Sequence, residues 1–219
     1  MPNVMAYTDK FADSCLATGQ MFLIAGGLTF VFGAIFGILL TVTRPGGIAE
    51  NKIVYRIVDL VTNIFRSIPF VILLIFLIPL TRFIVGTAIG VKGAIVPLVF
   101  GAVPFFTRQV GVALAGVDPG KVEAATAMGS SKLGIIFRVY LHEAVPDLIR
   151  VVTVTAISLI GLTTMAGAVG AGGIGSFAIN YGQLGAELGI VENAPEGSDY
   201  RFQVKEDVEF PISVTIEMK

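Results

Sequence analysis

Charged residues are scarce in this chain. Asp, Glu, Lys and Arg make up 14% of its 219 residues, whereas hydrophobic residues make up 54%. Soluble domains average about 25% charged residues, so this composition argues against a soluble domain. It favours a compact bundle of membrane-spanning helices, for which the length is sufficient.

Cysteine and histidine are nearly absent as well. Cys15 is the only cysteine and His142 the only histidine. A disulfide within one chain needs two cysteines, and a zinc site needs several Cys or His ligands. We therefore expect no disulfide framework, no metal centre and no metal-dependent enzyme. Both residues are expected to be structural or neutral.

Four apolar stretches are long enough to cross a bilayer, which takes roughly 20 residues. The expected spans are 18–42, 57–80, 93–115 and 150–173. Seven basic residues follow the first and third spans, against three on the opposite side before the C-terminal tail. Because basic residues concentrate in cytoplasmic loops, we expect the loop after the third span to be cytoplasmic and the N-terminus to be external.

Small residues and prolines interrupt these spans. Gly33 and Gly37 form a small-xxx-small pair that would let another helix approach closely, but glycine is common in membrane helices without such a role. We favour the second interpretation. Four prolines, each able to kink a helix, also fall inside expected spans: Pro69, Pro79, Pro97 and Pro104.

Polar residues within the spans need an explanation. Asp59, Asn63 and Arg66 share one face of the second span because they are spaced at i, i+4 and i+7. Ionisable groups inside a membrane are costly unless they pair or reach the interface. We expect these groups to lie at the cytoplasmic end of the span and to pair locally, rather than to act directly in transport. Arg108 in the third span allows the same interpretation.

A short helix with signals at both ends is predicted between the third and fourth spans. Asp118 suits the N-cap, Pro119 suits the first helical position, and Gly129 suits a left-handed stop. Its surface is mostly alanine, so it is slim enough to dock into a cleft of another protein, with Glu123 free for a charged contact. A helix lying on the membrane surface would need a basic face, which this segment lacks.

A pattern in this loop resembles the cytoplasmic signature of permeases in binding-protein-dependent ABC importers: Glu123-Ala124-Ala125, then Gly129, then Val139-x-Leu141. In that family the short helix is a coupling helix, which seats in a groove of the cytoplasmic ATPase. The family's usual proline after the leucine is His142 here. The resemblance implies a cytoplasmic coupling segment over 118–142 and an ATPase-coupling role for five residues: Glu123, Ala124, Ala125, Met128 and Gly129.

Further segments are most similar to permeases of the methionine-uptake type: 43–46, 63–70, 85–87, 94–98 and 167–173. The resemblance implies a homodimer that binds two copies of an ATP-binding subunit inside and receives its substrate from an external binding lipoprotein. It also implies that the fourth span lines the gate or pathway, with Met165, Gly167 and Gly170 as candidates. For Met165, a flexible apolar filler in helix packing is an equal alternative.

Two glycine patterns suggest nucleotide binding. Residues 170–175 fit the dinucleotide pattern G-x-G-x-x-G, which would make the chain a membrane-bound nucleotide-dependent oxidoreductase. That pattern needs a preceding strand, whereas the preceding residues form an uncharged run long enough to span a bilayer. Residues 116–122 approach the phosphate-binding loop, but Val122 replaces the hydroxyl residue that binds Mg²⁺. We therefore expect ATP hydrolysis in a partner subunit.

The last 33 residues differ in character from the rest. Residues 187–219 hold three basic and eight acidic residues, and apolar side chains alternate with polar ones near their end, as in a half-buried strand. The resembling family has a fifth span here. Either this soluble tail pairs with something outside the membrane, or the chain is a truncated or frame-shifted version of a longer permease, which we favour.

The sequence therefore predicts an all-α, polytopic helical bundle in the cytoplasmic (inner) membrane, in contact with the lipid bilayer. Residues 1–186 form the permease domain with four spans, and residues 187–219 form the atypical acidic tail. The resemblance implies import of an amino acid, methionine, with another small amino acid as the alternative. We expect no cofactor and no nucleic-acid partner.

Overall fold

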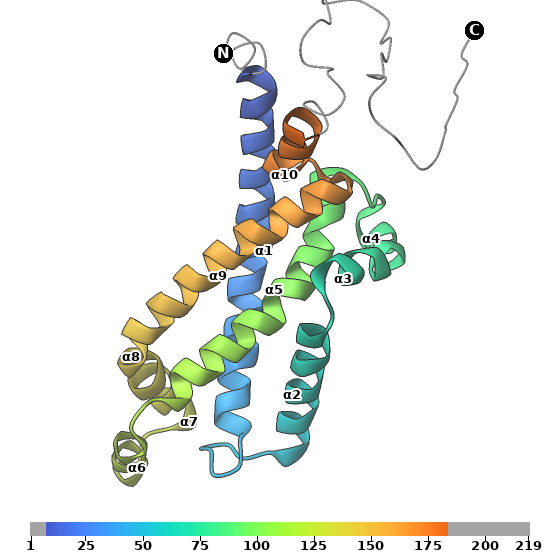
Figure 1. Cartoon of the computed structure of the whole chain (residues 1–219). Coiled ribbons are helices and arrows are strands. Elements are labelled where there is room, and N and C mark those ends of the chain that lie inside the picture. Colours follow the sequence, from blue (N-terminus) through green and yellow to red (C-terminus); the bar gives the residue numbers. More distant parts are fainter. Residues whose placement is uncertain (1–7, 184–219) are drawn as a thin grey trace, which may run out of the picture.

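The computed structural model describes residues 8–183, and this part of the chain is helical apart from short connections (Figure 1). Within it, three helices are long and apolar enough to cross a membrane: α1 (Thr8–Thr43), α5 (Gly90–Ala115) and α9 (Val145–Ala166), which the π-helical turn η3 (Gly167–Ala171) continues. The predicted all-α fold is confirmed for these residues. α5 and α9 begin a few residues before the expected spans, and α1 begins ten residues before its span.

Short elements join the long ones. The connection from α5 to α9 consists of α6 (Pro119–Ala127), α7 (Lys132–Ile135), the π-helical turn η2 (Ile136–Tyr140) and α8 (Leu141–Glu143). After η3 the chain continues through α10 (Gly173–Phe177) and the π-helical turn η4 (Ala178–Gln183). In Figure 1, α6 and the α1–α2 loop lie at one end of the molecule, and α10 lies at the other.

The predicted span over 57–80 is not a single straight helix, in line with the kink that Pro69 was expected to allow. This stretch is divided among α2 (Lys52–Ser67), α3 (Phe70–Phe76) and α4 (Ile78–Val85), and α2 and α3 meet at 104°. The cause is Pro69, which has no N–H to donate and forces its predecessor out of the helical region. Ile68 accordingly has φ −87° and ψ 123°. The described residues thus contain three long helices and one sharply bent pair, which is a fourth span if the pair crosses the membrane as one.

The close approach of α1 and α5 depends on two glycines. A Cβ atom built on Gly33 would lie 2.6 Å from Cδ1 of Phe106, and one built on Gly37 would lie 2.6 Å from Cβ of Val110. Both distances are far below van der Waals contact. The small-xxx-small pair therefore does serve a helix contact, and our preference for the opposite interpretation was wrong.

The outward faces of the long helices are apolar. Leu23 on α1 is 72% exposed and Ile157 on α9 is 67% exposed, and many large aliphatic and aromatic neighbours are exposed as well. A soluble protein rarely leaves so extensive an apolar surface in water. Such faces fit lipid or another membrane helix, in agreement with the membrane assignment. The predicted tail, 187–219, and its boundary with the permease domain lie outside the described residues.

Candidate functional site

The loop between α5 and α9 contains the helix that the sequence predicted. The Asp118 carboxylate accepts a hydrogen bond from the N–H of Gly120 at 2.8 Å, and Pro119 occupies the first turn of α6. At the other end Gly129 has φ +78°. The N–H of Ser130 donates to the carbonyl of Ala125 at 3.1 Å, and that of Gly129 donates to Thr126 at 3.0 Å, which together form a Schellman stop.

The five residues assigned to ATPase coupling do not form one surface. Glu123, Ala124, Met128 and Gly129 are exposed, and Met128 is 78% exposed. Ala125 is only 5% exposed, since it packs in the buried cluster that includes Ile135 and Tyr140. Ala125 thus fastens α6 to the bundle, and its neighbours are available to a partner.

An ion pair adds a second attachment for α6. Lys121 Nζ on α6 contacts Glu143 Oε2 on α8. The loop beyond α6 is ordered by Ser131, whose side chain accepts from the N–H of Gly134 at 3.1 Å. His142, which stands where the resembling family has proline, lies in α8 and is exposed. α6 therefore projects from one end of the molecule on a fixed base (Figure 1).

The other predicted site lies at the far end of α9. Met165 is 50% exposed, as a residue facing a pathway or a second subunit would be. Gly167 is buried, and a Cβ there would lie 2.7 Å from the carbonyl oxygen of Gly172. Gly170 has φ +98°, within the turn where the chain folds back into α10. The two glycines thus shape this turn, and a gate role for Met165 stays a prediction.

The same turn removes the basis for a dinucleotide site. Residues 170–175 follow helix α9 and the turn η3, whereas the nucleotide-binding fold requires a strand before these glycines. The alternative of an oxidoreductase is therefore wrong. The glycines instead allow α10 to dock on α1, where the N–H of Ile174 donates to Oγ1 of Thr18 at 2.9 Å.

The polar residues of α2 pair in a way that the sequence did not predict. Asp59 forms an ion pair with Arg108 of α5 at 3.1 Å, and it also accepts from Nδ2 of Asn63 at 3.1 Å. Local pairing was therefore correct for Asn63 and incomplete for Asp59. Arg66 has no ion-pair partner among residues 8–183, and it lies at the α2–α3 break rather than at the end of α2 near α6.

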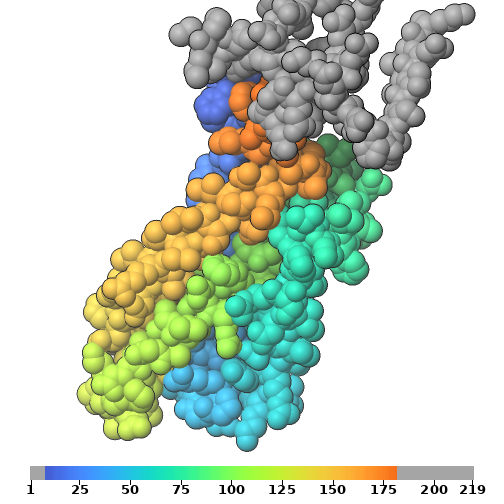
Figure 2. All heavy atoms as spheres, viewed as in Figure 1, coloured from blue at the N-terminus to red at the C-terminus, as the bar shows by residue number. Residues whose placement is uncertain are grey.

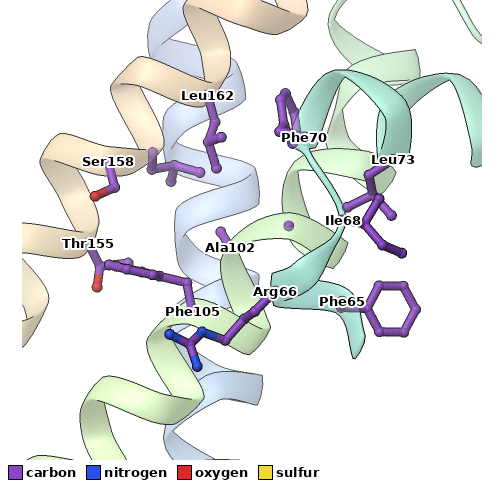
Figure 3. Close-up of a pocket in the computed structure, with 12 residues that line it drawn as sticks. Phe65, Arg66, Ile68, Phe70, Leu73, Ala102, Phe105, Thr155, Ser158 and Leu162 are labelled. Atoms are coloured by element: carbon purple, nitrogen blue, oxygen red, sulfur yellow. The ribbon is translucent and has the colours of Figure 1, made fainter. Parts of the chain in front are cut away.

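A hollow of about 270 Å³ opens beside this break (Figure 3). Its lining comes from four elements: α2, α3, α5 and α9. These elements all reach the surface on one face of the molecule (Figure 2). The spacing of Asp59, Asn63 and Arg66 indicated a polar face on α2, but the identity of the facing helices could come only from the fold.

Comparison with known proteins places the chain among transport proteins. The binding-protein-dependent transport system inner membrane component family matches residues 30–185. The D-methionine transport system permease protein MetI of Yersinia pestis is 51% identical over 150 residues, which are 68% of this chain and 69% of that protein. The protein of the same name from Escherichia coli strain K12 is 50% identical over 150 residues, with the same shares.

Solved structures agree with this. A structure of the MetNI methionine ABC transporter in inward-facing conformations has a TM-score of 0.76 at 48% identity, and the match covers 78% of this chain and 79% of that chain. An amino acid ABC transporter with a TM-score of 0.67 covers 84% of this chain and 82% of its own, but at 16% identity it shows the fold alone. The chain belongs to the family of binding-protein-dependent transport system inner membrane components, and it is a permease subunit rather than an enzyme.

Proposed function

We propose that this chain is the permease subunit of an ABC importer that carries methionine across the cytoplasmic membrane. The support for the substrate is the likeness to permeases and a transporter whose names concern methionine, at about 50% identity over more than two thirds of the chain. Import of another small amino acid is the alternative, because the coupling features of the fold do not depend on the substrate.

The observation that carries the proposal is the form of α6. It is capped at both ends, fastened to the bundle through Ala125, and it exposes Glu123, Ala124 and Met128 at the end of the molecule. A rigid, slim helix of this kind suits a groove on an ATP-binding subunit, with Glu123 making a charged contact there. Each permease copy would bind one ATPase copy, so that nucleotide-driven closure moves both permeases together.

A second copy of the chain completes the pathway in this proposal. The exposed side chains on α9 include Val154 at 46%, Ile157 at 67% and Met165 at 50%. A paired copy would cover part of this face, and Met165 would narrow the passage between the copies. An external binding lipoprotein would deliver methionine to the opposite end of the bundle from α6.

The test is uptake of radiolabelled methionine by cells that lack their own methionine importers. The cells receive this chain with an ATP-binding subunit and a binding lipoprotein from a methionine importer, and the control carries an ATPase subunit unable to hydrolyse ATP. We expect uptake that requires the active ATPase and that excess unlabelled methionine abolishes. ATP-dependent uptake of another amino acid without uptake of methionine would contradict the assigned substrate.

A further inference from the structure

Arg66 occupies an unusual place in the molecule. It lies in the last turn of α2, and 14 residues separate it from Lys52 at the start of that helix, which is roughly 21 Å along the axis. The junction of α2 and α3 lies about midway between the α6 end and the α10 end of the molecule (Figure 1). Arg66 is exposed on the surface of the single chain, and it lies near the middle of the membrane-spanning part.

The charge of Arg66 is not balanced by another side chain of the described residues. Arg108 of α5 forms the ion pair with Asp59, whereas no carboxylate among residues 8–183 lies within ion-pair distance of Arg66. The carbonyl end of α2 supplies only about half a negative charge. An arginine at membrane depth is costly unless an anion pairs with it, so this position calls for an anionic partner.

The surroundings of Arg66 suit a small molecule with one anionic group. Arg66 lines the 270 Å³ hollow and extends from the end of α2 toward α5, below Phe105 (Figure 3). Apolar side chains form most of the remaining wall, among them Phe70, Leu73 and Leu162. Across the hollow, α9 contributes Thr155 and Ser158, whose hydroxyls donate to the carbonyls of Val151 and Val154 on the same helix. A mostly apolar pocket with a few fixed polar groups is the usual form of a small-ligand site.

We propose that Arg66 binds the carboxylate of the amino acid in transit, while the apolar wall of the hollow receives its side chain. The guanidinium presents two parallel N–H donors, a geometry that matches a carboxylate and not a neutral alcohol or amide. This proposal rests on the proposed function, since it assumes an amino acid as cargo. It assigns substrate recognition within the membrane to a residue near the middle of the pathway, below the predicted gate at Met165.

The test uses the full complex, this chain with its ATP-binding subunit in lipid nanodiscs, and a radiolabelled diazirine analogue of methionine that keeps both the amine and the carboxylate. Light-induced labelling is measured on the permease band, separately from the ATPase band. We expect Arg66→Gln to lower permease labelling at least about tenfold, the usual cost of losing a charged hydrogen-bond partner. Arg66→Lys should retain an intermediate level, because it keeps the charge. Arg82→Gln, on exposed α4, is the matched control and should label like the parent chain.

Competition experiments on the unmodified complex test whether the carboxylate is recognised, even if the Arg66 variants assemble poorly. Unlabelled methionine should abolish labelling, whereas methioninol, which has the same side chain and amine without the carboxylate, should compete at least about tenfold more weakly. Equal competition by methioninol would overturn the proposal, as would parent-level labelling of Arg66→Gln. If carboxylate-bearing amino acids other than methionine compete and methionine does not, the substrate assigned under the proposed function is wrong and the carboxylate site stands.

Discussion

At the scale of single residues, the packing of α1 on α5 depends on the missing side chain of Gly37. A Cβ on this residue would lie 2.6 Å from Cβ of Val110 and 3.0 Å from the backbone oxygen of Thr107. The backbone atom cannot rotate away, so the helices would have to separate. On the same helix, a Cβ on Gly27 would meet nothing within 4 Å.

We predict that Gly37→Ala and Gly27→Ala have opposite effects on stability. Gly37→Ala should destabilise the protein by about 1–3 kcal/mol, the range for overpacking. Gly27→Ala should leave stability unchanged or raise it by up to about 1 kcal/mol through helix propensity. The measurement is the melting temperature of the detergent-purified protein. Equal melting temperatures for both variants would show that the two helices are not packed as described.

The sequence predicted some of these features from residue types and spacing. It did not predict which residues of other helices they contact. The spacing of Gly33 and Gly37 permitted a close helix contact, and the spacing of Asp59 and Asn63 gave a polar face. The folded bundle determines which residues of α5 lie opposite them, namely Val110 beside Gly37 and Arg108 beside Asp59. A single sequence without tertiary contacts therefore could not choose between a used and an unused motif.

At the scale of elements, α6 was predictable and the bent pair α2–α3 was not. The ends of α6 are fixed by local interactions, from the Asp118 side chain at one end to the positive φ of Gly129 at the other. The hydropathy of 57–80 shows that this stretch is apolar. It contains no information on the angle between successive helices. Pro69 was noticed as a possible kink, but its effect of 104° depends on the room that α5 and α9 leave for α3.

We predict that changes on α6 uncouple transport while the protein remains inserted and assembled. Glu123→Lys reverses the exposed charge, and Gly129→Leu puts a branched side chain at φ +78°, which costs roughly 1–2 kcal/mol. Both should reduce several-fold the stimulation of ATPase activity by the loaded binding protein in reconstituted complexes. Glu123→Gln, which removes the charge without reversing it, should fall between Glu123→Lys and the parent. Full stimulation in both Glu123→Lys and Gly129→Leu would remove α6 from the coupling role.

At the scale of the whole molecule, the orientation in the membrane can be tested at the two ends of the bundle. Thr87 lies in the connection between α4 and α5, and Ser130 follows α6. After Cys15 is replaced by serine, we predict that Thr87→Cys reacts with a membrane-impermeant maleimide in intact cells. Ser130→Cys should react only after the cells are opened. The reverse pattern would mean that the basic-residue count assigned the two sides wrongly.

The acidic tail gives a further prediction at this scale. Eight acidic residues against three basic ones should keep 187–219 out of the hydrocarbon, so that this segment cannot serve as a fifth span. We predict that a chain in which 187–219 is replaced by an apolar span with a basic end supports faster methionine uptake than the chain as given, at equal expression. Equal uptake by the two chains would show that the tail does not limit transport.

The burial of Ala125 has a mechanical consequence for the whole assembly. The cluster that holds Ala125 also contains Leu114 at the end of α5 and Ala144 at the start of α9. Close-packed protein interiors are hardly compressible. A force on α6 is therefore not absorbed at its base. Instead, α6 and the adjoining ends of α5 and α9 move together as one rigid body. The middle parts of α5 and α9 line the hollow beside Arg66, so a movement at one end of the molecule reshapes the space at its middle.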